Sequence, residues 1–131
     1  MIRRIQVRTR ARDDWVDITR EVRDAAAASG LAEGVVTVFV PHTTAAVAIQ
    51  ENADPPLKGD ITGALDRVFP WKAGWRHCED NAPSHMKAIV TGPSVQVVFS
   101  AGQLVLGTWQ AVYLTEFDGP REREVVLKVS P

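Results

Sequence analysis

The chain has 131 residues, of which 45% are hydrophobic and 24% are charged, and its formal net charge is −1. This length and composition are typical of one folded domain and exclude disordered and fibrous proteins. The nearly balanced charge also argues against nucleic acid or an anionic membrane as the partner, because both attract strongly basic surfaces.

The amino-terminal segment, the absence of a long apolar run and the single cysteine together favour a cytoplasmic protein. Residues 1–7 alternate apolar and polar side chains, which predicts a strand and not a signal peptide. No apolar run approaches the roughly 18 to 20 residues that a membrane-spanning helix needs. The single cysteine, Cys78, cannot form a disulfide within the chain, which favours a reducing compartment.

Residues 19–29 are predicted to form the first helix, because apolar side chains recur there at helical spacing and Gly30 ends the pattern. A β-branched run over residues 34–40 predicts a strand that breaks at Pro41, and residues 45–49 predict another. The intervening sequence PHTT, residues 41–44, therefore lies at a junction between two strands.

A second helix is predicted over residues 57–69, with Asp60 as its capping residue. Residues 71–81 have no periodicity but are rich in reactive side chains, which is typical of functional loops. Residues 84–90 predict a short third helix, with His85 near its N-terminus.

The last third of the chain predicts four strands, separated by turns at Ala101-Gly102 and at Asp118-Gly119-Pro120. Tight turns between consecutive strands predict that neighbours in sequence pair antiparallel. Both faces of residues 108–117 are partly apolar, so we expect both to be covered. The chain is predicted to be a single α+β domain, residues 1–131, with a largely antiparallel sheet or sandwich core and two to three short helices. The four predicted strands span residues 94–99, 103–106, 108–117 and 122–129.

Several local sequences resemble those of the YjbQ-like family, in the same order and over residues 2–129. They are PHTTAA at 41–46, QENADP at 50–55, DNAPSHMK at 80–87, LGTWQ at 106–110 and EFDGPR at 116–121. The resemblance implies a β-rich YjbQ-like fold, assembly as a homotrimer and a weak thiamine-phosphate synthase activity, which is a transferase reaction.

The three histidines, His42, His77 and His85, are the whole histidine content, and each lies in a polar motif. Three neutral imidazoles are enough protein ligands for a divalent ion such as Zn²⁺ or Mg²⁺, although their spacing matches no local zinc motif. Alternatively, His42 and His85 hydrogen-bond backbone groups and His77 is exposed. The resemblance carries all three histidines onto family motifs, which favours one shared site.

Glu51 is the preferred candidate for a general base, with His42 and His85 as the other catalytic candidates. The alternative for Glu51 is a solvated loop carboxylate or a partner of Lys58. Turn formation or helix capping accounts equally well for Asp54 and Asp80, and Glu79 is a further carboxylate of the same loop.

Hydroxyl, amide and cationic side chains near these motifs are candidates for binding a phosphorylated substrate. No glycine-rich phosphate loop is present, and each candidate is equally explained as a surface residue. The sequence Gly107-Thr108-Trp109-Gln110 is interpreted as a packing element. The substrate-binding candidates are Thr43, Thr44, Asn52, Ser84, Lys87 and Arg121, with Arg123 as a further cation.

Two functions from different classes follow. The first is an enzyme that acts on a small phosphorylated metabolite through a histidine-lined site with or without a metal. The second is a non-catalytic trimeric module that binds a metabolite or a metal.

Overall fold

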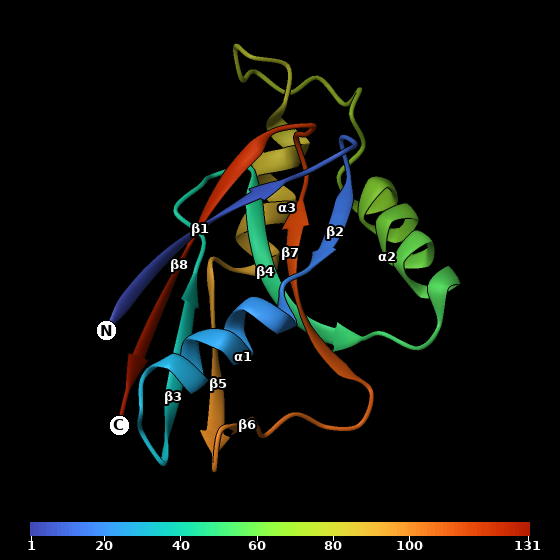
Figure 1. Ribbon diagram of the computed structural model, residues 1–131. Helices are drawn as coiled ribbons and strands as arrows, with labels where there is room; N and C mark the ends of the chain where they lie inside the picture. The colour runs from blue at the N-terminus through green and yellow to red at the C-terminus, as the bar shows by residue number, and fades with distance from the viewer.

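The computed structural model describes all residues, 1–131, and confirms the α+β class (Figure 1). The chain forms three helices and eight strands, and every strand pair is antiparallel. The elements are β1 (Ile2–Arg8), β2 (Asp14–Asp17), α1 (Thr19–Ala28), β3 (Glu33–Phe39), β4 (Ala45–Glu51), α2 (Pro55–Val68), α3 (Ala82–Thr91), β5 (Ser94–Ser100), β6 (Gln103–Leu104), β7 (Gln110–Glu116) and β8 (Glu122–Ser130).

Two sheets face each other across the main core. The larger has the strand order β1-β8-β3-β5-β6 and the smaller β2-β7-β4. Valine, leucine and phenylalanine at alternate positions of both sheets meet in this core, and α1 adds Val22, Ala25 and Ala26. The period of two in each strand thus directs one face of each sheet inward.

The outer face of the smaller sheet is covered by α3 and, in part, by α2. Ala46 of β4, Ala88 of α3 and Phe117 form a second cluster, against which Leu65 of α2 packs. This layer explains why six of the seven residues of β7 are buried, as expected from its two apolar faces. In Figure 1, α2 stands at the side of the molecule, and none of its residues is fully buried.

The outer face of the larger sheet has no covering layer. Apolar side chains occupy several of its outward positions, where Val35 of β3 pairs with Val98 of β5 and Phe39 pairs with Val126 of β8. Phe39 and Val98 are 43% and 53% exposed. None of the three helices has the length and continuous apolar character that crossing a membrane requires.

Three predicted details are wrong. The short strand β2 was not predicted, because its four residues give too little periodicity to detect. Helix α2 begins at Pro55, so Asp60 lies inside it. Proline suits a first helical turn, which the capping pattern at Asp60 concealed. Trp109 is 63% exposed in a turn before β7, so it is not part of a packed strand.

The predicted pairing of consecutive strands holds only for β5 and β6. Ala101 and Gly102 join them with φ angles of 53° and 74°, as a tight hairpin turn needs. The chain then crosses to the smaller sheet as β7 and returns to the larger one as β8, between β1 and β3. Each crossing brings a loop to one end of the sandwich.

Candidate functional site

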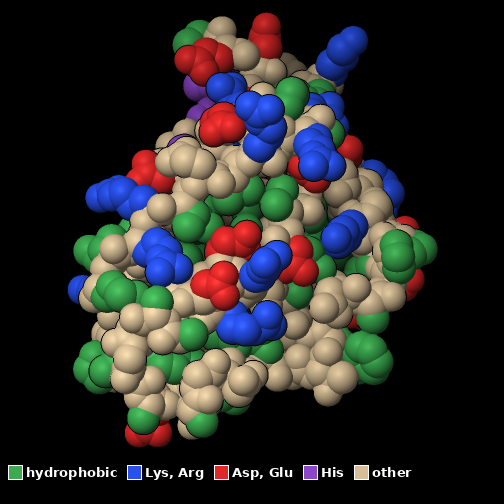
Figure 2. All heavy atoms as spheres, viewed as in Figure 1, with side chains coloured by type: hydrophobic (Ala, Val, Ile, Leu, Met, Phe, Trp, Pro, Cys, Tyr) green, Lys and Arg blue, Asp and Glu red, His purple; other side chains and the backbone are tan.

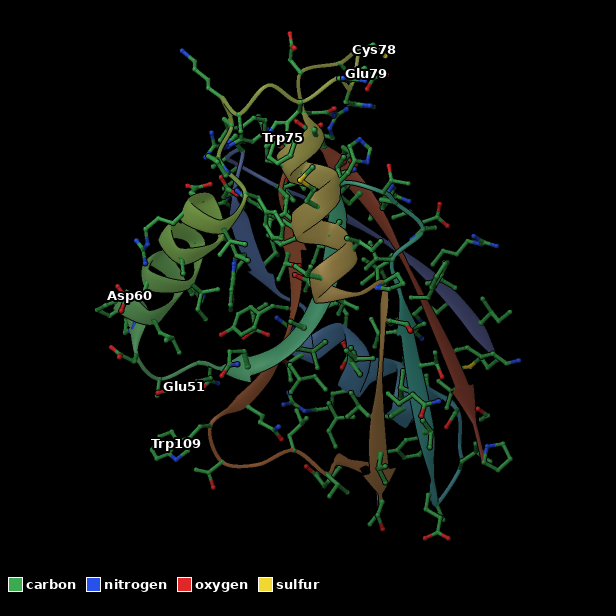
Figure 3. The ribbon with its side chains drawn as sticks, turned by 180° about the vertical axis from the view of Figure 1, so that it is seen from behind. Glu51, Asp60, Trp75, Cys78, Glu79 and Trp109 are labelled. Atoms are coloured by element: carbon green, nitrogen blue, oxygen red, sulfur yellow. The ribbon has the colours of Figure 1, made fainter.

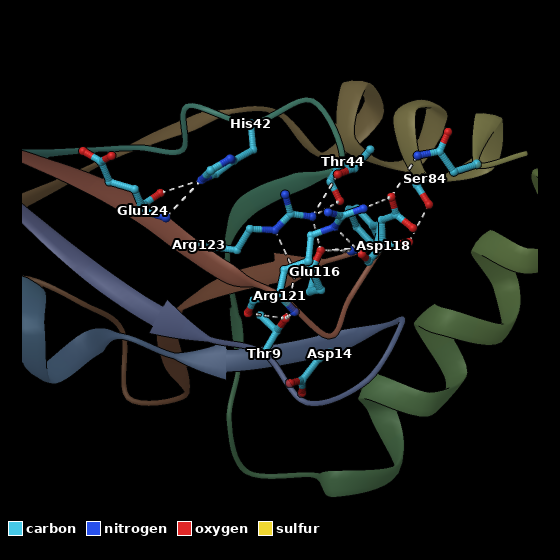
Figure 4. Close-up of polar contacts among 12 residues, drawn as sticks. Thr9, Asp14, His42, Thr44, Ser84, Glu116, Asp118, Arg121, Arg123 and Glu124 are labelled. Carbon is cyan, nitrogen blue, oxygen red and sulfur yellow. Dashed lines mark hydrogen bonds and ion pairs between the residues drawn. The ribbon is translucent and has the colours of Figure 1, made fainter. Parts of the chain in front are cut away.

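Three segments meet at one end of the sandwich and enclose an open pocket of about 340 Å³ (Figure 4). They are the connection between β3 and β4, the turn between β7 and β8, and the N-terminus of α3 with the loop before it. The pocket has no apolar lining residue other than Pro41. Its lining residues are Pro41, His42, Thr43, Thr44, Glu79, Asn81, His85, Asp118, Arg121 and Arg123.

Arg123 of β8, which lines this pocket, forms a buried ion pair with Glu116 of β7. Arg123 Nε donates to Glu116 Oε1 at 2.8 Å, and Arg123 Nη2 donates to Glu116 Oε2. Glu116 also accepts hydrogen bonds from Thr9 Oγ1 at 2.8 Å and from the backbone N–H groups of Phe117 and Asp118, both at 3.1 Å. The pair therefore links the two sheets and fixes the β7–β8 turn.

The pKa of Glu116 is lowered, although burial acts in the opposite direction. Burial alone would raise the pKa, because it penalises the charged carboxylate. The hydrogen bonds from Arg123, Thr9 and Asp118, together with the charge of Arg123, outweigh this effect. Glu116 is therefore ionised at neutral pH, and because both of its oxygens already accept hydrogen bonds, it is poorly placed to act as a general base.

One nitrogen of Arg123 has no partner in the protein. Nη2 donates to Thr44 Oγ1 at 2.8 Å as well as to Glu116, and Nε is engaged by Glu116, but Nη1 makes no hydrogen bond. In Figure 4 the unbonded nitrogen points away from Glu116, toward the side on which His42 lies. A buried cation thus keeps free N–H donors at the pocket.

The His42 side chain contacts the backbone of β8 at Glu124, just beyond the last residue pair between β3 and β8. Its Nε2 lies 3.0 Å from the backbone nitrogen of Glu124 and 3.1 Å from the backbone oxygen, beyond the end of β3. Burial and the neighbouring charge of Arg123 lower the pKa of His42 below 6.5, so the imidazole is neutral at pH 7. When Nε2 accepts from the Glu124 N–H, the proton is on Nδ1 and is free to be donated.

Arg121 and Asp118 form the rim of the pocket. Arg121 donates from Nε to the Asp118 carbonyl at 2.7 Å and from Nη2 to Asp118 Oδ2 at 3.0 Å, which leaves its Nη1 free. Asn81 Nδ2 donates to the same carboxylate oxygen at 2.8 Å. The other amide atom, Asn81 Oδ1, is buried without a partner.

The structure brings His85 to the same pocket as His42 and places His77 beside His85. The rings of His77 and His85 are 4.8 Å apart between centroids and are nearly perpendicular. His77 lines a neighbouring cavity of 440 Å³ together with Trp71 and Trp75. His85 Nε2 is buried without a hydrogen bond. In Figure 2 the histidine side chains visible on this face lie together at the upper left edge.

Glu51 and Asn52 are at the opposite end of the molecule. Figure 3 shows Glu51 near Trp109, far from Cys78 and Glu79 of the loop beside the histidines. Glu51 ends β4 and pairs with Gln110, while the other end of β4 begins at Ala45, next to His42. The six residue steps from Ala45 to Glu51 span about 20 Å of extended strand. Within one copy of the chain, Glu51 cannot serve His42 or His85 as a base.

Asn52 lines the largest cavity, of 620 Å³, with Gln110 and the first turn of α1. Arg20 and Arg23 are offset there by Asp17 and Glu21, and the cavity contains no imidazole. We therefore place the candidate site in the smaller pocket, where two histidines and two arginines converge.

Lys87 does not reach the pocket. Its ammonium is fully buried, with Asp66 Oδ1 at 2.6 Å and Asp13 Oδ1 at 3.2 Å, and it lies over the ring of Trp71. Both carboxylates already neutralise it, so it is not a free cation for a phosphate. Its contacts join α3 to α2 and to the loop between β1 and β2.

The hydroxyl-bearing candidates differ in how free they are. Thr43 is exposed and lines the pocket without a hydrogen bond of its own. Thr44 is buried and accepts from Arg123, and Ser84 is buried and donates to the Phe117 carbonyl at 2.5 Å. Thr44 and Ser84 therefore fix the walls of the pocket.

No group of three or more His, Cys, Asp or Glu side chains is arranged so that it could hold a metal ion. His42 Nε2 is occupied by β8, which leaves only its Nδ1 as a donor. The orphaned His85 Nε2 is the one buried imidazole nitrogen with unused coordinating capacity.

Thr9, Glu116 and Asp118 take part in the site but were not predicted from the sequence. A signal was present, because Glu116 follows Val112 and Leu114 on an inward face and Arg123 precedes Val125 and Leu127 on another. Opposite charges at core positions of two consecutive strands predict a buried ion pair. Asp118 and Thr9 left no such signal.

Comparison with known proteins gave one consistent family. The sequence profile described as UPF0047 protein YjbQ-like matches residues 3–131. UPF0047 protein YugU of Bacillus subtilis is 43% identical over 130 residues, which cover 98% of each chain. UPF0047 protein MJ1081 of Methanocaldococcus jannaschii is 39% identical, over 98% of this chain and 94% of the relative.

Solved structures give the same result. A conserved protein of the yjbq/upf0047 family from Clostridium acetobutylicum superposes with a TM-score of 0.95 at 45% identity, covering 97% of this chain and 98% of the other. A YbjQ-like protein from Sulfolobus solfataricus has a TM-score of 0.93 at 33% identity, covering 98% and 95%. These names give a family and no activity.

Proposed function

The chain belongs to the UPF0047 YjbQ-like family, and from the geometry of its site we propose that it binds the phosphate or diphosphate group of a small metabolite in the 340 Å³ pocket. The observation that carries this proposal is the convergence of unused N–H donors. Arg121 and Arg123 each keep a free Nη1, and neutral His42 can donate from Nδ1.

Charge and helix orientation add support. The N-terminus of α3 contributes Asn81 and His85 to the pocket, and the positive end of a helix favours an anion. Glu116 and Asp118 neutralise the two arginines, so the anion is held through directed hydrogen bonds and not through an excess of positive charge.

The enzymatic form of the proposal is a transfer in which diphosphate leaves. In thiamine-phosphate synthesis the thiazole nitrogen forms a bond to the pyrimidine methylene carbon while the carbon–oxygen bond to diphosphate breaks. The attacking nitrogen has no proton to lose, so this step needs no general base. The free N–H donors would stabilise the charge that develops on the leaving group. This requirement suits a pocket in which Glu116 is engaged and Glu51 is distant.

The non-catalytic module remains the second candidate, because the carboxylates of the pocket are engaged apart from Glu79. Asp118 is held by Asn81 and Arg121, and Glu116 by Arg123. Reactions that need a general base are therefore poorly served. Incubation with the two phosphorylated thiamine precursors, followed by mass spectrometry of the products, separates the candidates. Product that is lost in Arg121→Gln supports the enzyme, and binding without product supports the module.

Binding itself is tested by calorimetric titration with diphosphate. We expect Arg121→Gln to weaken binding about tenfold, because it removes one charge-assisted contact. Arg8→Gln is the matched control, since Arg8 is also exposed and paired with a carboxylate but lies outside the pocket. Equal binding by the parent and Arg121→Gln would refute the site.

Two further expectations belong to the same proposal. If Zn²⁺ or Mg²⁺ participates, His85 Nε2 and His42 Nδ1 are its first candidate ligands and His77 the next, and metal analysis of the purified protein tests this. Assembly as a homotrimer is supported by the uncovered apolar face of the larger sheet and by the weakly buried α2.

A further inference from the structure

A further cavity, of about 330 Å³, adjoins the 340 Å³ pocket proposed above to hold phosphate, which is called the phosphate pocket below. Its walls include Ala45 at the start of β4, Ala88 and Ile89 of α3, and Pro93 after that helix. Three other residues, His42, Thr43 and His85, line both this cavity and the phosphate pocket. The two cavities therefore share one wall, but the phosphate pocket is lined by polar and charged residues and the adjoining cavity by several apolar ones.

We infer that the ligand is amphipathic: its phosphate occupies the polar pocket, and an apolar body about the size of one ring extends past His42 and His85 into the adjoining cavity. This inference rests on the proposed phosphate site. It adds the chemical class of the ligand, an aryl or heteroaryl phosphate, which the phosphate contacts alone do not determine.

The walls of the adjoining cavity suit an apolar group. Ala45 and Ala88 are buried with small side chains, so they leave room at the back, and Ile89 at the mouth is 80% exposed. Covering such an exposed apolar side chain with a ligand removes apolar surface from water and therefore favours binding. His42 and His85 both line this cavity with their imidazole rings, and flat apolar bodies pack well against such rings.

The experiment compares methyl phosphate with phenyl phosphate by calorimetric titration. Both carry the same anion, and they differ only in the apolar group. We expect phenyl phosphate to bind the parent protein about tenfold more tightly, because the ring buries additional apolar area. Ile89→Ser should remove most of this preference and leave methyl phosphate binding unchanged.

Val90→Ser is the matched control, because Val90 follows Ile89 on α3, is 59% exposed and does not line the cavity. It should leave both affinities unchanged. Equal binding of the two phosphates by the parent protein, with no effect of Ile89→Ser, would overturn the apolar subsite while the phosphate site stands.

Two other outcomes would also overturn the inference. If neither phosphate binds, the proposed function fails and the subsite with it. If Ile89→Ser and Val90→Ser both lower the molecular mass measured by light scattering, this surface of α3 is a contact between copies of the chain and not a ligand wall.

Discussion

Glu116 and Arg123 each place a full charge on a strand position whose inward neighbours are valine and leucine. The pair is tolerated because both carboxylate oxygens of Glu116 also accept hydrogen bonds, from Thr9 and from the backbone N–H groups of Phe117 and Asp118. Removing one partner leaves the other charge buried and uncompensated, which is far more costly than losing a surface ion pair.

We therefore expect Glu116→Gln to lower the free energy of unfolding by about 3 kcal/mol at pH 7. Urea denaturation measures the change. Glu122→Gln is the control, because Glu122 forms a comparable pair with Arg8 at an exposed position, and it should cost less than about 1 kcal/mol. Similar losses in the two variants would contradict the importance of the buried pair.

The same carboxylate makes stability depend on acid. The pKa of Glu116 is lowered by folding, so its contribution is present above the unfolded value near 4.5 and disappears as the pH falls through the folded value. Stability of the parent protein should fall more steeply than that of Glu116→Gln as the pH decreases below 4.5. Parallel curves from urea denaturation at several pH values would refute this.

His42 is the second titrating group of interest. Burial and Arg123 lower its pKa below 6.5, so protonation opposes the folded state and the stability it contributes is lost as the pH falls below 6.5. An NMR titration should show the His42 ring titrating below 6.5, with its signals identified by their absence in His42→Asn. Diphosphate should raise this pKa, because a nearby anion favours the imidazolium. A midpoint at or above 6.5 in the free protein would contradict the geometry.

At the scale of elements, the β7–β8 turn depends on close backbone contact at Gly119. A Cβ atom there would lie 2.3 Å from the Ala11 carbonyl oxygen and 2.8 Å from both Glu116 Cγ and Thr9 Oγ1. Because the first obstacle is backbone, the side chain cannot be accommodated by a rotamer change. The turn holds Arg121 and Asp118 at the rim of the pocket.

Gly119→Ala is therefore expected to destabilise the protein by roughly 2 kcal/mol or more. Thermal unfolding monitored by circular dichroism measures it. Gly59→Ala is the control, since Gly59 lies within α2 with open space around it and alanine should stabilise that helix by about 0.5 to 1 kcal/mol. If Gly119→Ala melts like the parent but no longer binds diphosphate, the turn acts in binding and not in folding.

Lys87 fixes α3, the helix that carries His85. Lys87→Met should remove the buried cation between Asp13 and Asp66, leave them only the partly exposed Arg12 as a cationic partner, and cost about 3 kcal/mol of unfolding free energy. Lys58→Met is the control. It removes an ammonium that lies over the Tyr113 ring and forms no ion pair, so it should cost less than about 1 kcal/mol. Urea denaturation of both variants checks the difference.

The elements themselves were largely predictable from the sequence, because helices such as α1 and strands such as β3 have strong local periodicity. Their pairing was less so. The strand β8 is placed between β1 and β3, which are far from it in the chain, and no local pattern encodes this. The approach of His42 to β8 follows from that same placement. Glu51 was predicted as the general base from its sequence motif. Its distance from His42 follows only from the length of β4, which separates the two residues.

For the whole molecule, the uncovered apolar face of the larger sheet predicts association. We expect light scattering to give three times the chain mass of 14.4 kDa at micromolar concentration. Replacing Phe39 and Val98 with serine together should lower that mass, because both lie outward on this face. The outward Gln96→Ser is the control. A stable monomer in the parent protein would remove the trimer from the proposal.

The position of β8 also has a consequence for how the protein is made. Strand β1 pairs only with β8, from Ile2 opposite Lys128 to Arg8 opposite Glu122, and the two termini lie on the same side of the molecule in Figure 1. Because β8 is synthesised after β1 and β3, β1 and one edge of β3 stay unpaired until β8 has left the ribosome. Arg123 belongs to β8, so the pocket that it lines cannot form before this strand inserts between β1 and β3.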